Sequence, residues 1–425
     1  MKPQTFASII AVIVVAALSA PIRLAAQEQG GQPRYSVTDL GTLGGTSSVA
    51  YSVNKRGWVA GTASLAGNTA QHAVLWRKET KTDLGTLGGP NSTAFFPLND
   101  RGEVSGFSDT PNADPYGEDF CGFGTHLVCL PFVWQHGAKT ALPTLGGNNA
   151  IANEVNNKGQ VGGVAETNTL DPTCVPPQAL QALPVVWENG EIDELPTFPG
   201  DPDGFVNAIN DSGQAVGASG QCYTAEPGIH ALLWQNDSVT DLGNLGGTMN
   251  HFPQDINNQG QVVGFSNLPS NTTTHGFLWE NGAITDLGTL PGDFWSFAFS
   301  INSNAEVVGQ SCNSDFSICR AFLWQKGVMT DLNSLISAGS ALSLLVAYNV
   351  NDRGEITGQG FDQNTGTTPA FLAIPCDEVG CEAASSSMAR VTSDPPKVPL
   401  PENIRNLLRR QLRFGRFGAT LTRPQ

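Results

Sequence analysis

Apolar and polar positions along the chain follow one pattern that recurs seven times. Each copy has an aliphatic–Asn pair, a Gly seven residues later, and a second apolar run that ends in Trp in six copies. The Asn residues of the pairs are Asn54, Asn99, Asn156, Asn210, Asn257, Asn302 and Asn351. Self-similarity at a period of about 45 to 57 residues indicates a solenoid or a propeller.

The fifth copy divides most clearly into strands, which we call a to d. They are predicted near residues 251–256, 261–265, 275–279 and 283–287. The a–b link ends in Gly260, and the c–d link contains Asn281-Gly282, a strong signal for a tight hairpin. Four consecutive strands joined this way form an up-and-down antiparallel sheet, which is the unit of a propeller blade.

The two ends of the repeat region complement each other. The region begins with a lone strand d at 35–40, and its seventh copy holds strands a (345–350), b (355–358) and c (370–374) but no d. Pairing the first strand with the last blade closes the ring and removes two exposed sheet edges. We therefore predict an all-β fold, a seven-bladed β-propeller of four-stranded antiparallel blades over 35–381, closed by its N-terminal strand.

Composition agrees with this architecture. The chain has 425 residues, of which 40% are hydrophobic, enough for a sizeable core. Its 48 glycines would interrupt long helices, which disfavours a coiled coil or a helical bundle. The formal net charge of −16 makes nucleic acid a poor partner, and we expect none.

The N-terminal residues read as a targeting segment. Lys2 precedes an uncharged run from Ala7 to Ala20, and small residues follow at Ala25 and Ala26, so residues 1–26 are predicted to be a signal peptide. The run is short for the alternative, an uncleaved membrane anchor. Residues 27–34 form a short segment before the repeats. We expect a secreted protein, extracellular or periplasmic, in an oxidising compartment.

The C-terminal residues differ from the repeats. Residues 382–400 are predicted to be a Pro/Ser-rich linker, and 401–425 a basic amphipathic tail beginning with a helix. Aliphatic residues at Ile404 and Leu408 share one helix face with Leu407. We expect this tail to contact either an anionic surface or the acidic disc of the propeller itself.

Eight cysteines lie in loops of the repeat region or directly after it. Their spacing and the ring geometry favour the pairs Cys121–Cys129, Cys174–Cys222, Cys312–Cys319 and Cys376–Cys381. The second pair would connect the b–c loops of neighbouring blades. A metal site is the alternative, but the chain has no CxxC spacing, and we name no metal ligand.

Several repeated segments carry a family resemblance. TDLGTLGG (38–45 and 82–89), DINNQGQVVGFS (255–266) and the motifs HAVLW, HALLW, HGFLW and RAFLW resemble the bacterial extracellular repeats of the HAF family. The resemblance covers residues 35–375 and implies secretion and a repeat fold. It implies no activity, cofactor or catalytic residue.

Residues that recur at equivalent positions of several blades are expected to be structural. The strand-c tryptophans should form the core between blades, and the Asp of the Asp-Leu motif should cap its neighbouring turn. His72, His230 and His275 belong to different blades, which makes a shared metal site improbable.

Candidate ligand-binding residues lie where the copies differ. The b–c connections are longest in the second, third and fourth blades, and loops on a rigid scaffold commonly carry function. Tyr116 and Asp119 belong to the insert of the second blade. Trp295 lies outside the repeated Trp register and could stack on a sugar ring. Glu154 and Asp255 precede aliphatic–Asn pairs and could face the channel mouth.

These features support two functions. The first is a non-catalytic binding or surface-interaction module that uses its loop face to hold an extracellular ligand, such as a glycan or a protein, without a cofactor. The alternative is a secreted polysaccharide-active enzyme, a hydrolase or lyase, with carboxylates at the channel mouth. No catalytic or cofactor-binding residue follows from the motifs themselves.

Overall fold

The structure is a computed structural model that describes residues 34–78, 80–96, 98–222, 229–236, 238–336, 340–376 and 399–411. The predicted signal peptide, nearly all of the linker, and the tail beyond residue 411 lie outside the described residues. Among the described residues, no helix is long and apolar enough to cross a membrane.

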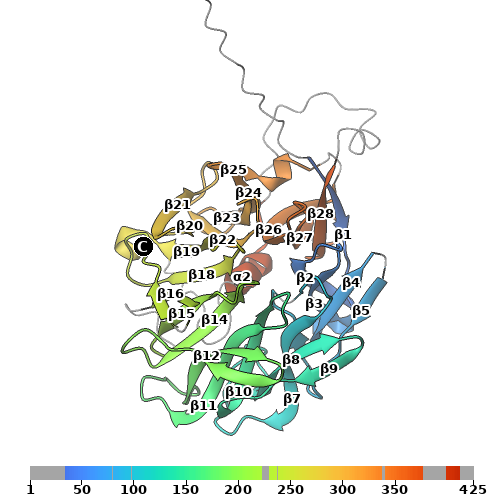
Figure 1. The fold of residues 1–425 in the computed structure, drawn as a ribbon. Helices are drawn as coiled ribbons and strands as arrows, with labels where there is room; N and C mark the ends of the chain where they lie inside the picture. The colour runs from blue at the N-terminus through green and yellow to red at the C-terminus, as the bar shows by residue number, and fades with distance from the viewer. Residues whose placement is uncertain are drawn as a thin grey trace, which may run out of the picture. The chain divides into compact units, whose positions relative to one another are not determined.

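Seven four-stranded antiparallel sheets form a ring, which confirms the predicted propeller (Figure 1). The strands of blades one to four are β2 (Gly44–Val53), β3 (Val59–Leu65), β4 (Gln71–Arg77) and β5 (Thr80–Asp83); β6 (Ser92–Thr93), β7 (Val104–Ala113), β8 (Leu127–Gln135) and β9 (Ala138–Ala141); β10 (Gly146–Val155), β11 (Val161–Leu170), β12 (Leu180–Glu188) and β13 (Glu191–Glu194); and β14 (Asp203–Ile209), β15 (Ala215–Gly220), β16 (His230–Gln235) and β17 (Ser238–Asp241).

The remaining three blades are built the same way. Their strands are β18 (His251–Ile256), β19 (Val262–Asn267), β20 (Thr274–Glu280) and β21 (Ala283–Gly288); β22 (Trp295–Ile301), β23 (Val307–Cys312), β24 (Cys319–Gln325) and β25 (Val328–Asp331); and β26 (Leu342–Val350), β27 (Ile356–Asp362), β28 (Ala370–Cys376) and β1 (Arg34–Asp39). Among the described residues, short 3-10 helices lie in connections at Ala66–Asn68, Pro269–Asn271 and Leu332–Ser334. In the described part of the chain, helix α2 (Glu402–Gln411) follows the propeller.

The ring closes as the sequence predicts. β1 pairs antiparallel with β28 over its whole length, from Arg34 opposite Cys376 to Asp39 opposite Phe371. The strand also contributes Tyr35 to the core, where only 2% of the residue is exposed. The first residues of the described chain therefore complete the seventh blade, and β28 is not left as the open edge of a three-stranded sheet.

The glycine seven residues after each repeated Asn has a steric cause. At Gly264, a Cβ atom would lie 2.1 Å from the carbonyl oxygen of Phe252, closer than any real contact. A register shift between Pro253 and Asp255 marks a bulge in β18 that brings this carbonyl inward. Any side chain at Gly264 would push the two strands apart.

The repeated tryptophans tie blades together, which confirms their expected role in the inter-blade core. The indole Nε1 of Trp76 in blade one donates to the carbonyl of Leu40, 2.9 Å away in the connection that enters from blade seven. Trp187 and Trp234 make matching bonds to Pro143 and Pro196, which lie in the connections from their own preceding blades. All three rings are nearly fully buried. Burying a large apolar side chain contributes about 1.5 to 3 kcal/mol.

The Asp-Leu motif is a local cap, also as predicted. The Asp83 carboxylate accepts a hydrogen bond from the N–H of Gly85 at 2.7 Å, and Asp286 does the same with Gly288. Each carboxylate also contacts the strand-c histidine of its own blade, at 2.9 Å for His72 and 3.0 Å for His275. His72 and His275 therefore each form a contact within their own blade.

Three predicted disulfides are present, Cys121–Cys129, Cys174–Cys222 and Cys312–Cys319. The second connects the b–c loops of blades three and four, as expected. Cys376 is also disulfide-bonded, while its predicted partner, Cys381, lies outside the described residues. Disulfides of this kind persist in oxidising, extracellular or periplasmic compartments.

Candidate functional site

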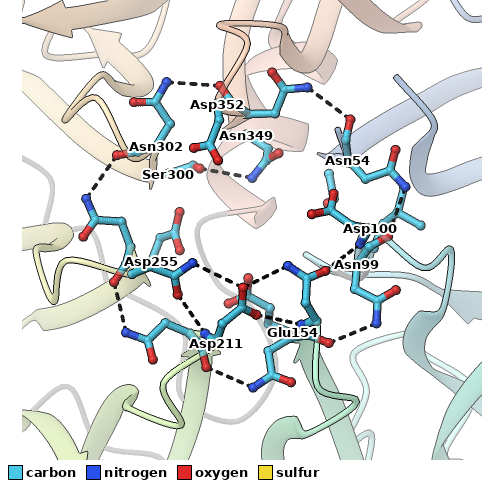
Figure 2. A pocket seen from close by; sticks show the side chains of 18 of the residues that line it. Asn54, Asn99, Asp100, Glu154, Asp211, Asp255, Ser300, Asn302, Asn349 and Asp352 are labelled. Atoms are coloured by element: carbon cyan, nitrogen blue, oxygen red, sulfur yellow. Dashed lines mark hydrogen bonds between the residues drawn. The ribbon is translucent and has the colours of Figure 1, made fainter. Parts of the chain in front are cut away.

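A closed ring of hydrogen bonds surrounds one end of the central channel, the end bordered by the a–b turns, which we call the a–b mouth (Figure 2). The side-chain amide of each repeated Asn donates to the main-chain carbonyl of the equivalent Asn in the next blade. All seven distances fall between 2.9 and 3.1 Å. The repeated Asn therefore fixes each blade to its neighbour, all the way around the ring.

The same Asn side chains also shape the a–b turns. In blade five, the Asn257 oxygen accepts from the N–H groups of Gln259 and Gln261, at 3.1 and 3.0 Å. Gly260 completes this turn with a positive φ of 80°, a conformation that favours glycine. One residue thus folds its own turn and bonds to the next blade, which explains why it recurs in every copy.

The residues after the repeated Asn form an outer layer of the mouth. Asp100 accepts from the N–H of Lys55 at 2.9 Å, Asp211 from Asn157 at 2.8 Å, and Asp352 from Ser303 at 3.0 Å. The Lys55 ammonium lies 3.4 Å from both Asp100 and Asp352. Main-chain donors and one lysine hold these carboxylates in place.

The carboxylates of this outer layer are poised to stay ionised. Burial opposes ionisation of Asp211, but hydrogen bonds from Asn157 and Asn258 outweigh it and lower the pKa of its carboxyl group. The pKa of Asp352 is lowered in the same way, by hydrogen bonds from Ser303 and by the charge of Lys55, again against burial. The mouth therefore carries fixed negative charge at neutral pH.

Inside this layer lies a polar cavity of about 170 Å³, lined by residues from all seven blades. Both predicted channel carboxylates, Glu154 and Asp255, line it (Figure 2). Burial raises the pKa of both groups, and the negative charge of Asp255 raises that of Glu154 further. The two carboxylates therefore interact within one cavity.

Glu154 and Asp255 are also bonded to the neighbouring blades. Glu154 Oε2 accepts from the N–H of Ile209 at 3.1 Å, and Asp255 Oδ2 accepts from Ile301 at 2.9 Å. The second oxygen of Asp255 accepts from the N–H of Ile256 at 2.7 Å.

Two other blades make the same bond with uncharged residues. Asn349 Oδ1 accepts from the N–H of Val53 at 3.0 Å, and Ser300 Oγ from Val350 at 3.4 Å. Asn349 and Ser300 occupy the position two residues before the repeated Asn, as Glu154 and Asp255 do. The bond between blades therefore does not require a carboxylate.

The other predicted ligand residues lie at the opposite ends of the strands, on the face of the b–c and d–a loops. Tyr116 is 48% exposed, and the Asp119 carboxylate accepts from the N–H of Gly124 in its own loop. Trp295 is only 2% exposed and donates to the carbonyl of Ser314. The expectation that Trp295 offers a ring for stacking is wrong, because the blade-six b–c loop covers it. The five candidates therefore do not form one site.

The loop-face mouth of the channel is filled. An aromatic cluster that includes Tyr51, Phe297, Phe299 and Tyr348 occupies it, and apolar residues of α2 belong to the same cluster. Figure 1 shows α2 near the centre of the ring. The predicted amphipathic helix is thus present, and its described part contacts the propeller. Sequence periodicity identified the apolar face of the helix but not the surface that receives it.

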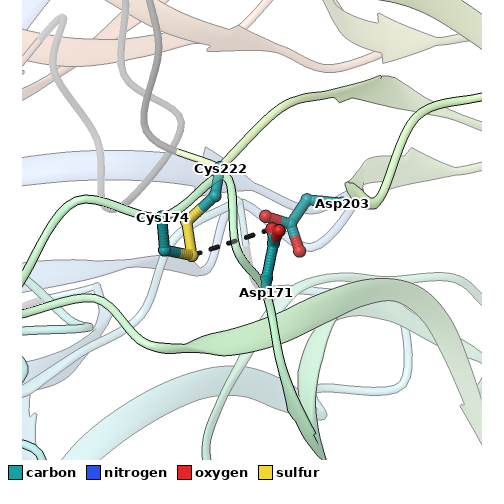
Figure 3. Close-up of side chains that lie close together, drawn as sticks. All are labelled: Asp171, Cys174, Asp203 and Cys222. Atoms are coloured by element: carbon teal, nitrogen blue, oxygen red, sulfur yellow. Dashed lines mark hydrogen bonds between the residues drawn. A yellow bond between two sulfur atoms is a disulfide. The ribbon is translucent and has the colours of Figure 1, made fainter.

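Four potential metal ligands gather between blades three and four (Figure 3). Donor atoms of Asp171, Cys174, Asp203 and Cys222 lie within 4.8 Å of one another. Thiolate sulfurs would suit zinc, but here the two sulfurs are joined in a disulfide. The Asp203 side chain is fully buried and accepts from the N–H of Ala182 at 2.6 Å. With its two cysteines joined in a disulfide, this cluster is a structural cross-link between blades three and four.

Comparisons with known proteins give distant structural likenesses only. No family model matches the chain, and no curated protein matches it. Among solved structures, the β-propeller domain of the Trilobed protease from Pyrococcus furiosus is 10% identical, with a TM-score of 0.44, covering 67% of this chain and 81% of that one.

Two further solved structures are similarly distant. Trypanosoma rangeli sialidase is 10% identical with a TM-score of 0.39, covering 83% of this chain and 61% of that one. TolB from Acinetobacter baumannii is 9% identical with a TM-score of 0.39, and the match covers 72% of this chain and 76% of that one. The chain thus spans less than two thirds of the sialidase, and these values carry no information on activity.

Proposed function

We propose that this protein is a secreted, non-catalytic binding module, and that its ligand occupies the polar cavity at the a–b mouth. All seven blades contribute to the cavity, and the Asn ring fixes its outline. A rigid concave site with converging polar groups is typical of small-molecule binding. The centre of the loop face, by contrast, is covered by α2.

One observation carries the preference for binding over catalysis. Glu154 and Asp255 accept the same inter-blade hydrogen bond that Ser300 and Asn349 accept elsewhere in the ring. A general acid–base pair needs groups that reach the substrate and exchange a proton with it. Because both oxygens of Asp255 already accept main-chain N–H groups, this residue is poorly suited to that task. The polysaccharide-active enzyme remains the alternative.

Charge suggests the chemical class of the ligand. Asp211 and Asp352 stay ionised, and Asp100 adds a third carboxylate to the outer layer. Among the described residues that line the cavity, Lys55 is the one cationic side chain, and it is already paired with Asp100 and Asp352. The excess negative charge favours a small polar cation, such as an amine or an amino sugar.

Calorimetric titration of the full chain tests this proposal. We expect glucosamine to bind and neutral glucose to bind at least about tenfold more weakly, because only the former carries a charge that the mouth can neutralise. Asp352→Asn preserves the acceptor for Ser303 but removes a charge, so it should weaken glucosamine binding. Asp193→Asn is the matched control, since Asp193 is exposed on β13, away from the cavity.

Two results would contradict the proposal. Equal heats for glucosamine and glucose in wild type and Asp352→Asn would exclude a cation site at this mouth. Release of reducing sugar from a polysaccharide by the wild-type chain, abolished in Glu154→Gln, would instead establish the enzyme.

A further inference from the structure

Helix α2 presents one apolar face to the loop-face mouth. Ile404 and Leu408, one helical turn apart, are 5% and 2% exposed, and Leu400 just before the helix is 5% exposed. All three belong to the same apolar cluster as Phe316 and Trp295. The opposite side of the helix, at Asn403 and Asn406, is exposed.

The blade-six b–c loop is the receptor for this helix. The Cys312–Cys319 disulfide closes the loop, and Asn313 and Ile318 form a main-chain hydrogen bond across it at 3.0 Å. Phe316 stands at its tip with a φ of 61°, an uncommon conformation for a bulky residue. The loop thereby turns the Phe316 ring inward, where it is buried against Trp295 and the helix.

Polar contacts on the same loop fix the position of α2. The N–H of Leu400 donates to the carbonyl of Ser317 at 2.7 Å, and Arg409 donates to the carbonyl of Asp315 at 2.5 Å. The Arg409 guanidinium also lies 5.3 Å from the centre of the Phe316 ring, and Arg405 lies 3.8 Å from the Asp315 carboxylate. Aliphatic anchors each followed by an arginine thus match an aromatic surface with an acidic edge.

The propeller is complete without the helix. The seven sheets of the described blades consist of strands β1 to β28, and α2 contributes to none of them. The ring closes through the pairing of β1 with β28 and through the hydrogen bonds of the repeated Asn residues. Residues 377–398 join β28 to the helix, and at about 3.3 Å per residue this connection can span several tens of ångströms. A helix as short as α2 is marginal in water and depends on its docking surface.

We propose that the loop-face mouth is a recognition site for an amphipathic helix and that α2 is its exchangeable occupant. The site takes a helix with aliphatic residues at i and i+4, each followed by arginine, which is helix-in-groove recognition. The connection keeps α2 at a high effective concentration, so a free copy of the same helix competes poorly until α2 is displaced. Release of α2 exposes the aromatic surface to a partner of that chemistry.

The test uses the full-length chain and a fluorescent peptide of residues 399–411. In Ile404→Asp/Leu408→Asp protein, whose own helix can no longer dock, we expect the peptide to bind at least about tenfold more tightly than to wild type, measured by anisotropy. Asn403→Asp/Asn406→Asp, which adds the same two charges on the exposed side, should behave as wild type. A peptide carrying both aspartates should not bind.

Failure of the doubly substituted protein to bind the peptide, while it retains the wild-type circular dichroism and melting transition, overturns the proposal. If that variant does not fold, hydrogen exchange on the wild type decides. Amides of α2 should exchange at least about tenfold faster than those of β23, through local opening. Equal protection of α2 and β23 would make the helix a permanent part of the core and also overturn the proposal.

Discussion

The side-chain amide of Asn351 donates to the main-chain carbonyl of Asn54 at 3.1 Å, although 297 residues separate them in the chain. This is the bond that completes the Asn ring. It lies on the inner strand of the blades, whereas the pairing of β1 with β28 lies on the outer strand. The propeller is therefore closed at two places, near the channel and at its circumference.

Loss of one ring asparagine should destabilise the whole propeller. In Asn257→Ala, the carbonyl of Asn302 loses its donor, and the N–H groups of Gln259 and Gln261 lose their acceptor. Buried polar groups left without partners cost about 1 to 3 kcal/mol. We expect a loss of about 2 to 3 kcal/mol in the free energy of unfolding, measured by guanidinium titration.

The control for this substitution is Gln259→Ala in the same turn. Gln259 is exposed and contributes only its main-chain N–H to the Asn257 oxygen, which alanine retains. Its unfolding midpoint should match that of the wild type. An equal effect of the two substitutions would show that the amide ring contributes nothing specific.

Removal of β1 tests the outer closure. Deleting residues 34–39 leaves the seventh blade with three strands, exposes the edge of β28, and removes the buried Tyr35. We expect the single cooperative thermal transition to be lost, and aggregation to follow from the open edge. Calorimetry of the deletion protein checks this, and an unchanged melting midpoint would be incompatible with closure by β1.

The sequence was sufficient for the fold because each blade repeats the same local signals. Strand lengths, the turn at Gly260 and the lone first strand together specified seven blades and their closure. The ring of amides could not be predicted in the same way. Alternation along a strand indicates which face a side chain such as Asn257 occupies, but not which main-chain group of the next blade it reaches.

Trp295 shows the same limit for the candidate site. Its place outside the repeated Trp register was correctly recognised, yet its exposure depends on how the blade-six b–c loop folds over it. That loop is shaped by a disulfide and by the unusual backbone of Phe316, neither of which has a periodic signature. The burial of Trp295 depends on this one irregular loop, so the repeat pattern could not predict it.

The disulfide between blades should contribute more stability than the local ones. Cys174–Cys222 closes a segment with a sequence separation of 48, and Cys121–Cys129 one of 8. In the chain-entropy model these loops stabilise the folded state by about 4 and about 2 to 3 kcal/mol. Denaturant titration of the two Cys→Ser double variants should reproduce this order. The reverse order would indicate that strain or residual structure dominates.

The channel carboxylates predict an unusual dependence of stability on pH. Burial and the charge of Asp255 hold the folded-state pKa of Glu154 well above its ordinary value of 4.5. The folded state therefore binds this proton more tightly than the unfolded chain. The protonated Glu154 therefore adds to the free energy of unfolding below about pH 4.5. This contribution is lost as the pH rises toward the folded-state pKa, by about 1.4 kcal/mol per pH unit.

Glu154→Gln should remove that loss, because glutamine has no proton to release and its oxygen can still accept from Ile209. We expect a higher melting temperature than wild type at pH 8 and an equal one at pH 4. Asp255→Asn is the contrasting variant: both Asp255 oxygens accept main-chain N–H groups, and an amide nitrogen would face one of these donors. It should destabilise the protein by about 1 to 3 kcal/mol at both pH values. If Glu154→Gln were instead destabilising at pH 8, Glu154 would be ionised in the folded channel and the linkage would have the opposite sign.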